Sequence, residues 1–207
     1  DSWSMNLFKV MGWRCASIMS VKSAKNQHLI GRNLDDIGRE TGRHPFDVAC
    51  DLLLEEEGRV LVFETATYPG DPLIEQSLLY PLLSAHSSIV TDTILLGFGL
   101  PSNLFYDAFP RFISQYARDK KLIRVAEAIR KCSALPAKQL GIPQRGQIRE
   151  GYHADLLLFD LDRLAIRSTV QDPCHFPEGI HTVLVNGKVV VDPQGFHPEP
   201  RAGQLIR

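Results

Sequence analysis

Through the first 135 residues, short apolar or β-branched runs alternate with segments whose apolar residues recur every three or four positions. Runs of the first kind predict three buried strands, at Cys15–Met19, Val60–Phe63 and Ser87–Thr93. Segments of the second kind predict helices at 34–41, 45–57, 72–83, 104–118 and 124–133. Strands that alternate with helices in this order are typical of a parallel sheet covered by helices, so the pattern predicts an α/β fold.

Five residues mark the ends of the early helices. Asn33 and Asp71 are suited to cap helix amino termini, because their side-chain oxygens can accept a bond from an unpaired backbone N–H. Pro45 favours a first helical turn. Gly42 and Gly58 stand where a helix commonly ends in the left-handed conformation.

The pattern changes near Arg145, after which strand signals dominate. Ala154–Leu161 is a predicted strand, and two later apolar runs flank Asn186-Gly187. An Asn-Gly pair between such runs is the strongest short hairpin signal and predicts a type I′ turn. We therefore expect two domains, an α/β body at 1–144 and an all-β tail at 145–207.

Composition excludes several classes of protein. The chain has 207 residues, is 44% hydrophobic and carries a formal net charge of −1. Such a balance gives no electrostatic reason to expect nucleic acid or an acidic membrane surface. No apolar run is long enough to span a bilayer. The four cysteines are far apart and form no Cys-x-x-Cys pair, which favours free thiols and a cytoplasmic location.

Asp92 is the first candidate for chemistry, because it ends the predicted strand Ser87–Thr93 and precedes a glycine-rich stretch. In a (β/α)₈ barrel, residues at the carboxyl ends of the strands point into the active site. The alternative is an aspartate that caps the following turn by accepting a backbone N–H. Local sequence leaves both roles open.

The histidine inventory argues against a complete metal site in this chain. None of the seven histidines forms a His-x-His or an i, i+4 pair. A catalytic zinc site needs three converging protein ligands, usually histidines and carboxylates. The sequence also has no Gly-x-Ser-x-Gly motif and no glycine-rich phosphate loop.

Several segments, taken in order, carry a resemblance to a known family. They are Ser20–Asn26, Asp47–Gly58, Ala108–Arg111, Ala126–Lys131, Leu135–Ala137, Arg145-Gly146, Gly151–Leu156, Gly179-Ile180 and Val185–Gly187. From about Gly12 to Arg207, the chain resembles the carboxyl-terminal half of a metal-dependent amidohydrolase of the D-aminoacylase (N-acyl-D-amino-acid deacylase) family. The Gly-x-x-Ala-Asp-Leu segment followed by Val-Asn-Gly is the most specific part, and its residues are structural in that family.

This resemblance implies the closing part of a (β/α)₈ TIM barrel followed by a small all-β sandwich. It implies hydrolysis of a linear amide C–N bond with one or two zinc ions, and Asp92 as the general base that acts on the attacking water. Asp92 would also be placed to touch one metal. The remaining zinc ligands would lie in the first half of the barrel, which is absent from these 207 residues. That half, from the same gene product or a separate chain, is the expected partner.

One motif departs from the family. The family usually has a His-Pro-Arg after the aspartate, and its arginine binds the substrate carboxylate; the corresponding residues here are Leu100-Pro101-Ser102. Serine cannot replace a bidentate guanidinium. Recognition of a free carboxylate is therefore not expected. Ser102 and Asn103 remain candidate pocket residues, and Arg111 is expected to form a structural ion pair.

Two other functions compete with this hypothesis. A half-barrel could serve as a non-catalytic structural or assembly subunit, with Asp92 only a loop cap. A cyclic-amide hydrolase related to dihydroorotase or hydantoinase is the other, since the signature of the β-domain is shared with those enzymes.

Overall fold

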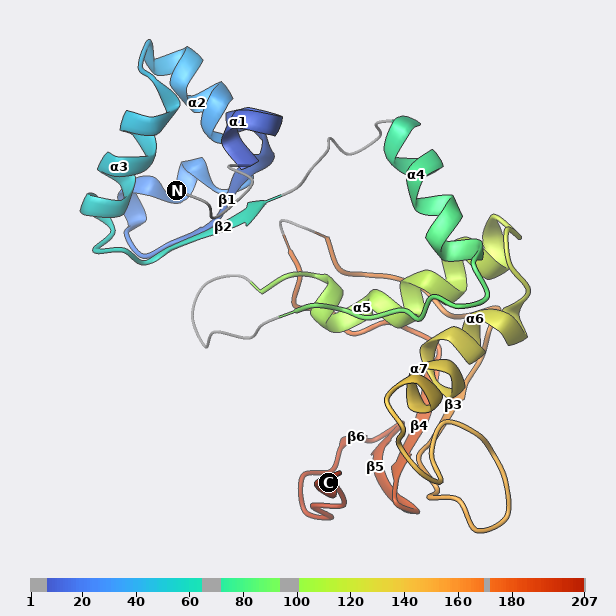
Figure 1. The fold of residues 1–207 in the computed structure, drawn as a ribbon. Coiled ribbons are helices and arrows are strands. Elements are labelled where there is room, and N and C mark those ends of the chain that lie inside the picture. The colour runs from blue at the N-terminus through green and yellow to red at the C-terminus, as the bar shows by residue number, and fades with distance from the viewer. Residues whose placement is uncertain (1–6, 65–71, 94–100, 170–171, 207) are drawn as a thin grey trace. The chain divides into compact units, whose positions relative to one another are not determined.

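A computed structural model describes residues 7–64, 72–93, 101–169 and 172–206 (Figure 1). The chain folds into two compact units. The amino-terminal unit comprises residues 1–79, 94–102 and 169–174, and the carboxyl-terminal unit comprises 80–93, 103–168 and 175–207. Among the described residues, no helix is both long enough and apolar enough to cross a bilayer.

The amino-terminal unit is built on two strands, β1 (Ala16–Val21) and β2 (Val60–Glu64). Its helices are α1 (Leu7–Met11), η1 (Trp13–Cys15), η2 (Ala24–Leu29), α2 (Leu34–Thr41) and α3 (Pro45–Glu55). The helices α2 and α3 bury one face each against β1, and Ile18 at the centre of this core is fully buried. Burial of that apolar surface is the main force that holds the unit together.

The predicted helix ends are confirmed. The Asn33 side chain accepts a bond from the Asp36 amide at 2.9 Å, and Gly42 ends α2 with a φ of 65°. Pro45 lies in the first turn of α3, and Gly58 follows that helix with a φ of 74°. The predicted cap at Asp71 lies outside the described residues.

The direction of the strands differs from the prediction. The sequence pattern predicts parallel strands, but β1 and β2 pair antiparallel, with Ile18 opposite Val62. In the sequence, the connection from β1 to β2 contains two α-helices, α2 and α3, after the short η2. A single crossover helix returns the chain to a parallel direction, whereas a second helix reverses it once more.

A buried carboxylate, Glu56, ties the end of α3 to the end of β1. It accepts bonds from the Ser23 hydroxyl at 2.5 Å, the Asn26 amide at 2.7 Å, and the backbone N–H groups of Ser23 and Lys22 at 2.7 and 2.6 Å. The Ser23 hydroxyl contributes most to lowering the pKa of Glu56 to about 2; burial opposes it, and the other donors assist. Glu56 is therefore ionised and fully paired in the fold.

We expect this carboxylate to make the amino-terminal unit acid-sensitive. Because its pKa is about 2 in the fold against an ordinary value of 4.5, its contribution is complete above pH 4.5. That contribution is lost as the pH falls towards 2. Denaturant midpoints of the complete protein measured from pH 6 to pH 2, a range set by these pKa values, should show a smaller acid-induced loss for Glu56→Gln than for the wild type. The exposed Glu150→Gln is the control, and an unchanged acid limb in Glu56→Gln would contradict this role.

Within the carboxyl-terminal unit, the helices precede the strands along the sequence. The helices are the end of α4 (Pro72–Leu83), α5 (Leu104–Arg111), the π-helix η3 (Phe112–Asp119), α6 (Val125–Cys132) and α7 (Ala134–Gln139). Phe112, Ala128 and Leu164 are buried at the centre of their shared core. The positions of α4, of α5 with η3, and of α6 agree with the predicted ranges, whereas α7, which contains Pro136, was not predicted.

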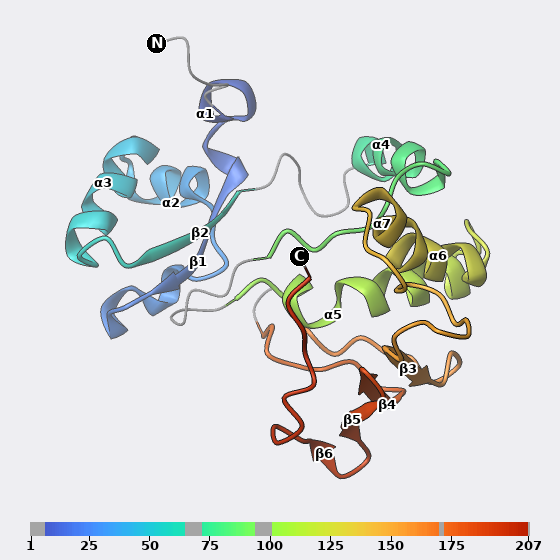
Figure 2. The same cartoon turned by 60° about the horizontal axis from the view of Figure 1, so that its bottom comes forward.

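A four-stranded antiparallel sheet follows the helices (Figure 2). Its strands lie in chain order: β3 (Leu156–Phe159), β4 (Ile180–Val185), β5 (Lys188–Asp192) and β6 (Gly195–Phe196). Asn186 and Gly187 connect β4 to β5 with φ angles of 47° and 78°. Two positive φ angles are what a type I′ turn requires, so the predicted hairpin is confirmed.

The two most specific sequence segments meet at this hairpin. The backbone N–H of Asn186 donates to the Asp155 carboxylate at 2.8 Å, and Arg145 pairs with Asp155 and donates to the Asn186 side chain. The Asp of Gly-x-x-Ala-Asp-Leu thus fixes the turn of Val-Asn-Gly. This contact explains why both segments occur together and supports a structural role for them.

Candidate functional site

The segment that carries Asp92 runs from Ser84 to Thr93, after α4. The predicted strand at Ser87–Thr93 is not formed; the segment is irregular, and no described strand pairs with it. Instead, the Ile89 N–H donates to the Lys131 carbonyl of α6 at 3.1 Å. The apolar residues satisfied the pattern of a strand, but a strand also needs a neighbouring strand to take its backbone hydrogen bonds. Here a helix takes part of that role.

Lys131 makes more hydrogen bonds to the segment before Asp92 than any other residue of α6 or α7. Its side chain is fully buried, and its Nζ donates to the Ser84 carbonyl, the Ser87 carbonyl at 2.8 Å and the Ser87 hydroxyl at 3.0 Å. Burial lowers the pKa of the ammonium group, and the nearby Glu127 carboxylate acts in the opposite direction. The three donors of the ammonium group match the three oxygen acceptors.

Two further side chains hold the same segment. Arg130 donates to the Ala85 carbonyl at 2.8 Å. Gln139, from α7, donates to the His86 carbonyl at 2.7 Å and accepts from the Ser88 hydroxyl at 2.8 Å. Every residue from Ser84 to Ile89 is therefore hydrogen-bonded to α6 or α7. We call Arg130, Lys131 and Gln139 the clamp.

Asp92 lies three residues beyond the last clamped position. Its side chain is exposed, and its backbone has a φ of 45°. The hydroxyls of Thr91 and Thr93 on either side are 3.2 Å apart, within hydrogen-bond distance. In the described part of the chain, no backbone N–H donates to the exposed Asp92 carboxylate.

Ser102 and Asn103 lead into α5. The Asn103 carbonyl accepts bonds from the backbone N–H groups of Tyr106 and Asp107 at 3.0 and 3.2 Å, and its side chain does not cap the helix. No hydrogen bond between Asn103 and Asp92 is present among the described residues. Residues 94–100, including Leu100 of the departing motif, lie outside the described part.

Arg111 is a structural residue, as predicted. Its guanidinium binds the fully buried Asp107 carboxylate with two bonds, of 3.0 and 2.7 Å. It also donates to Ser168, whose hydroxyl bonds the same carboxylate. This network joins α5 to the loop after β3 and leaves Arg111 engaged rather than open to a ligand.

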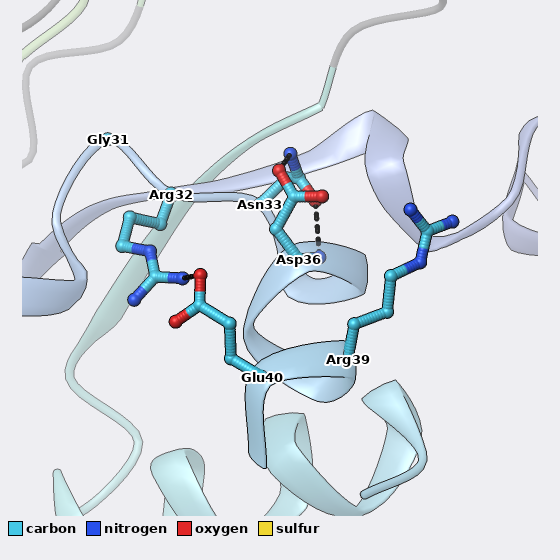
Figure 3. A pocket seen from close by; sticks show the side chains of 6 residues that line it. All are labelled: Gly31, Arg32, Asn33, Asp36, Arg39 and Glu40. Carbon is cyan, nitrogen blue, oxygen red and sulfur yellow. Dashed lines mark hydrogen bonds and ion pairs between the residues drawn. The ribbon is translucent and has the colours of Figure 1, made fainter. Parts of the chain in front are cut away.

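An open pocket of about 420 Å³ lies at the start of α2 (Figure 3). Its lining residues are Gly31, Arg32, Asn33, Asp36, Arg39 and Glu40. Arg32 pairs with Glu40 at 2.5 Å, and Asp36 accepts from the Asn33 amide at 2.7 Å. The two positive and two negative side chains balance each other. This pocket contains none of the residues that the sequence singled out for chemistry.

Metal ligands do not gather in the described parts of either unit. No group of three or more His, Cys, Asp or Glu side chains that could hold an ion occurs there. Individual histidines have local roles: His44 accepts from the Phe46 amide at the start of α3, and His197 pairs with Asp192. On its own, this part of the chain does not fit a zinc ion; Asp92 offers one carboxylate.

Sequence reasoning missed the clamp, although one signal was present. Lys131 lies three residues after Ala128, on the helix face that α6 buries. A lysine at a core-facing position needs internal acceptors, because an unpaired buried charge is very costly. That mismatch could have marked Lys131 as a residue with a buried partner, but the partner could not be deduced from spacing.

Comparison with sequence families gives one match in the second half of the chain. The sequence profile that describes the amidohydrolase family matches residues 99–191. This range covers α5 to β5, including the hairpin that joins the two specific segments.

Two curated relatives come from Alcaligenes xylosoxydans xylosoxydans. A D-aminoacylase is 31% identical over 179 residues, which are 86% of this chain and 34% of that protein. An N-acyl-D-aspartate deacylase is 37% identical over 168 residues, which are 80% of this chain and 33% of that protein. The chain thus spans about a third of the length of the curated relatives it matches.

Solved structures of similar proteins agree with this result. A D-aminoacylase studied for its binuclear metal centre superposes with a TM-score of 0.75 at 29% identity, over 92% of this chain and 37% of the other. An N-acyl-D-glutamate deacylase from Bordetella bronchiseptica, solved with zinc and a phosphonate inhibitor, gives a TM-score of 0.77 at 24% identity. It covers 97% of this chain and 39% of the other, and at this identity the likeness concerns the fold.

Proposed function

We propose that the chain is the carboxyl-terminal part of a metal-dependent amidohydrolase, because the sequence profile of the amidohydrolase family matches residues 99–191 and the chain is similar to D-aminoacylases. The proposed reaction is hydrolysis of a linear amide C–N bond in a substrate like an N-acyl-D-amino acid. The observation that carries the proposal is the Asp92 carboxylate, which is exposed and accepts no backbone N–H from the described residues, at the end of a clamped segment.

Asp92 acts as general base and then as general acid. Its carboxylate accepts a proton from the water that attacks the amide carbon, and it later delivers this proton to the leaving nitrogen. A bound divalent metal would lower the pKa of the attacking water towards about 7. Since the described residues do not fit the ion by themselves, we propose that residues outside this chain hold one or two zinc ions.

The same proposal accounts for the architecture. Residues 1–144 would contribute the closing part of a (β/α)₈ barrel, and 145–207 a β-domain. The remaining barrel would come from the same gene product or from a separate chain. In that assembly, the segment from Val90 to Thr93, beyond the clamped residues, would gain neighbouring strands. Ser102 and Asn103 would line the substrate pocket.

Metal removal and reconstitution test the proposed function. We expect the complete protein to release a D-amino acid from N-acyl-D-amino acids, and a D-amino acid amide from the corresponding amides, with a carboxylic acid as the other product. A chelator should abolish this activity, and zinc should restore it. A protein with a full complement of metal that hydrolyses none of these compounds would refute the proposal and favour the non-catalytic subunit. Preferred hydrolysis of a cyclic amide would instead favour a hydantoinase-like or dihydroorotase-like reaction.

The substrate carboxylate should contribute little to recognition. Ser102 occupies the position at which the family resemblance places an arginine, and Arg111 is already bound to Asp107. Arg14 is likewise paired with Asp35. We therefore expect N-acyl-D-amino acid amides to be hydrolysed with a kcat/KM at least equal to that of the free acids. A strong preference for the free acid would mean that a cation outside these residues binds the carboxylate.

A further inference from the structure

The clamp points to a role for Lys131 in the reaction. We infer that Lys131 is a positioning residue, which acts through the backbone of Ser84–Ile89 to hold Asp92 at the reacting atoms. This inference rests on the proposed function, because it takes Asp92 to be the general base.

The contacts of Lys131 are specific rather than general packing. Its ammonium group has three donors, and all three are used on oxygen atoms of Ser84 and Ser87. Loss of the ammonium group would leave the half-buried Ser87 carbonyl without its Lys131 donor and would leave the Ser84 carbonyl with only the longer bonds from the Ser87 hydroxyl and N–H, at 3.2 and 3.4 Å. The segment would then move to find water or another partner.

The rest of the clamp acts on the same stretch of backbone. Arg130 and Gln139 hold Ala85, His86 and Ser88, which lie between or beside the residues that Lys131 binds. The Lys131 carbonyl also accepts the Ile89 N–H at 3.1 Å. Two helices therefore fix six consecutive residues of an irregular segment, which has no described strand to hold it in register.

Asp92 follows the last clamped residue, Ile89, closely along the chain, so the clamp can restrict the position of the Asp92 carboxylate. Only two residues, Val90 and Thr91, lie between Ile89 and Asp92, and an extended chain spans about 3.3 Å per residue. Few rotatable bonds therefore separate the clamp from the carboxylate. Displacement of a reacting group by about 1 Å can cost about 10²-fold in rate.

A double-mutant cycle in the complete enzyme tests the inference. The variants are Lys131→Met, Asp92→Asn and the double variant, with kcat, KM and metal content measured for each. We expect Lys131→Met to lower kcat about 10- to 100-fold at unchanged metal content. In the Asp92→Asn background, the same change should lower kcat less than about twofold, because the group that Lys131 positions is already lost.

If Lys131 served only to stabilise the fold, the double-mutant cycle would give different changes in kcat. If Lys131→Met only reduced the folded fraction, it would lower kcat by the same factor in both backgrounds, and equal factors would overturn the inference. A wild-type kcat in Lys131→Met beside an inactive Asp92→Asn would overturn it while leaving the proposed function intact. Full activity in Asp92→Asn would overturn the proposed base, and this inference with it.

A second variant covers the case in which Lys131→Met does not fold. Gln139 is exposed, so Gln139→Ala removes two clamp bonds without opening the core. We expect it to lower kcat by about threefold, in line with loss of modest hydrogen bonds. Lys138→Ala is the matched control, since this exposed neighbour on α7 makes no hydrogen bond to residues 84–89. Identical kcat values for the two alanine variants would contradict the positioning role.

Discussion

Replacement of Asp92 by asparagine should abolish nearly all amidase activity of the complete enzyme while leaving its fold intact. Asparagine preserves the shape of the side chain but cannot accept a proton. Loss of a general base typically lowers kcat by about 10²–10⁴-fold. Asparagine is also the right replacement for the backbone, because Asp92 has a φ of 45°, and asparagine tolerates the left-handed region well.

The controls separate chemistry from folding. The thermal midpoint and metal content of Asp92→Asn should equal those of the wild type. Asp162→Asn makes the same change at an exposed aspartate of the same unit, and its kcat should be normal. Retention of more than about half of the wild-type kcat in Asp92→Asn, against the loss expected for a general base, would show that another group is the base.

The sequence predicted those features that depend on near neighbours. Asn33 and Gly42 bound α2 through contacts within a few residues. The Asn186-Gly187 turn needs two positive φ angles, which these residue types adopt readily. Helix ends and tight turns are set by local backbone geometry, so the residue types at these positions were sufficient to predict them.

Features that depend on distant partners could not be predicted in the same way. The antiparallel pairing of β1 with β2 joins residues 39 to 48 positions apart along the chain. The clamp joins Lys131 to Ser84 and Ser87 across a similar separation. An apolar run such as that before Asp92 shows which residues favour a strand, but not whether a neighbouring strand or a helix will take their hydrogen bonds.

The apolar side chains that are exposed in the described part of the chain bear on how residues 1–207 behave when they are expressed alone. Several large apolar side chains are exposed in both units: Leu54 is 78% exposed, Tyr80 85% and Ile148 89%. On β2, Val62 and Phe63 are also exposed. Exposed apolar surface and open strand edges promote association with other chains. In the proposed enzyme, the rest of the barrel would cover part of this surface.

We therefore expect that residues 1–207, expressed alone, will not form an independent zinc enzyme. Size-exclusion chromatography should show aggregates or mixed oligomers, and thermal melting should lack a single cooperative transition. Metal analysis should find far less than one zinc per chain, because the described residues contain no three-ligand group. The complete protein, measured in parallel, should bind zinc and melt cooperatively. A cooperatively melting monomer of residues 1–207 would refute the need for a partner, and stoichiometric zinc in it would show that ligands within this chain suffice.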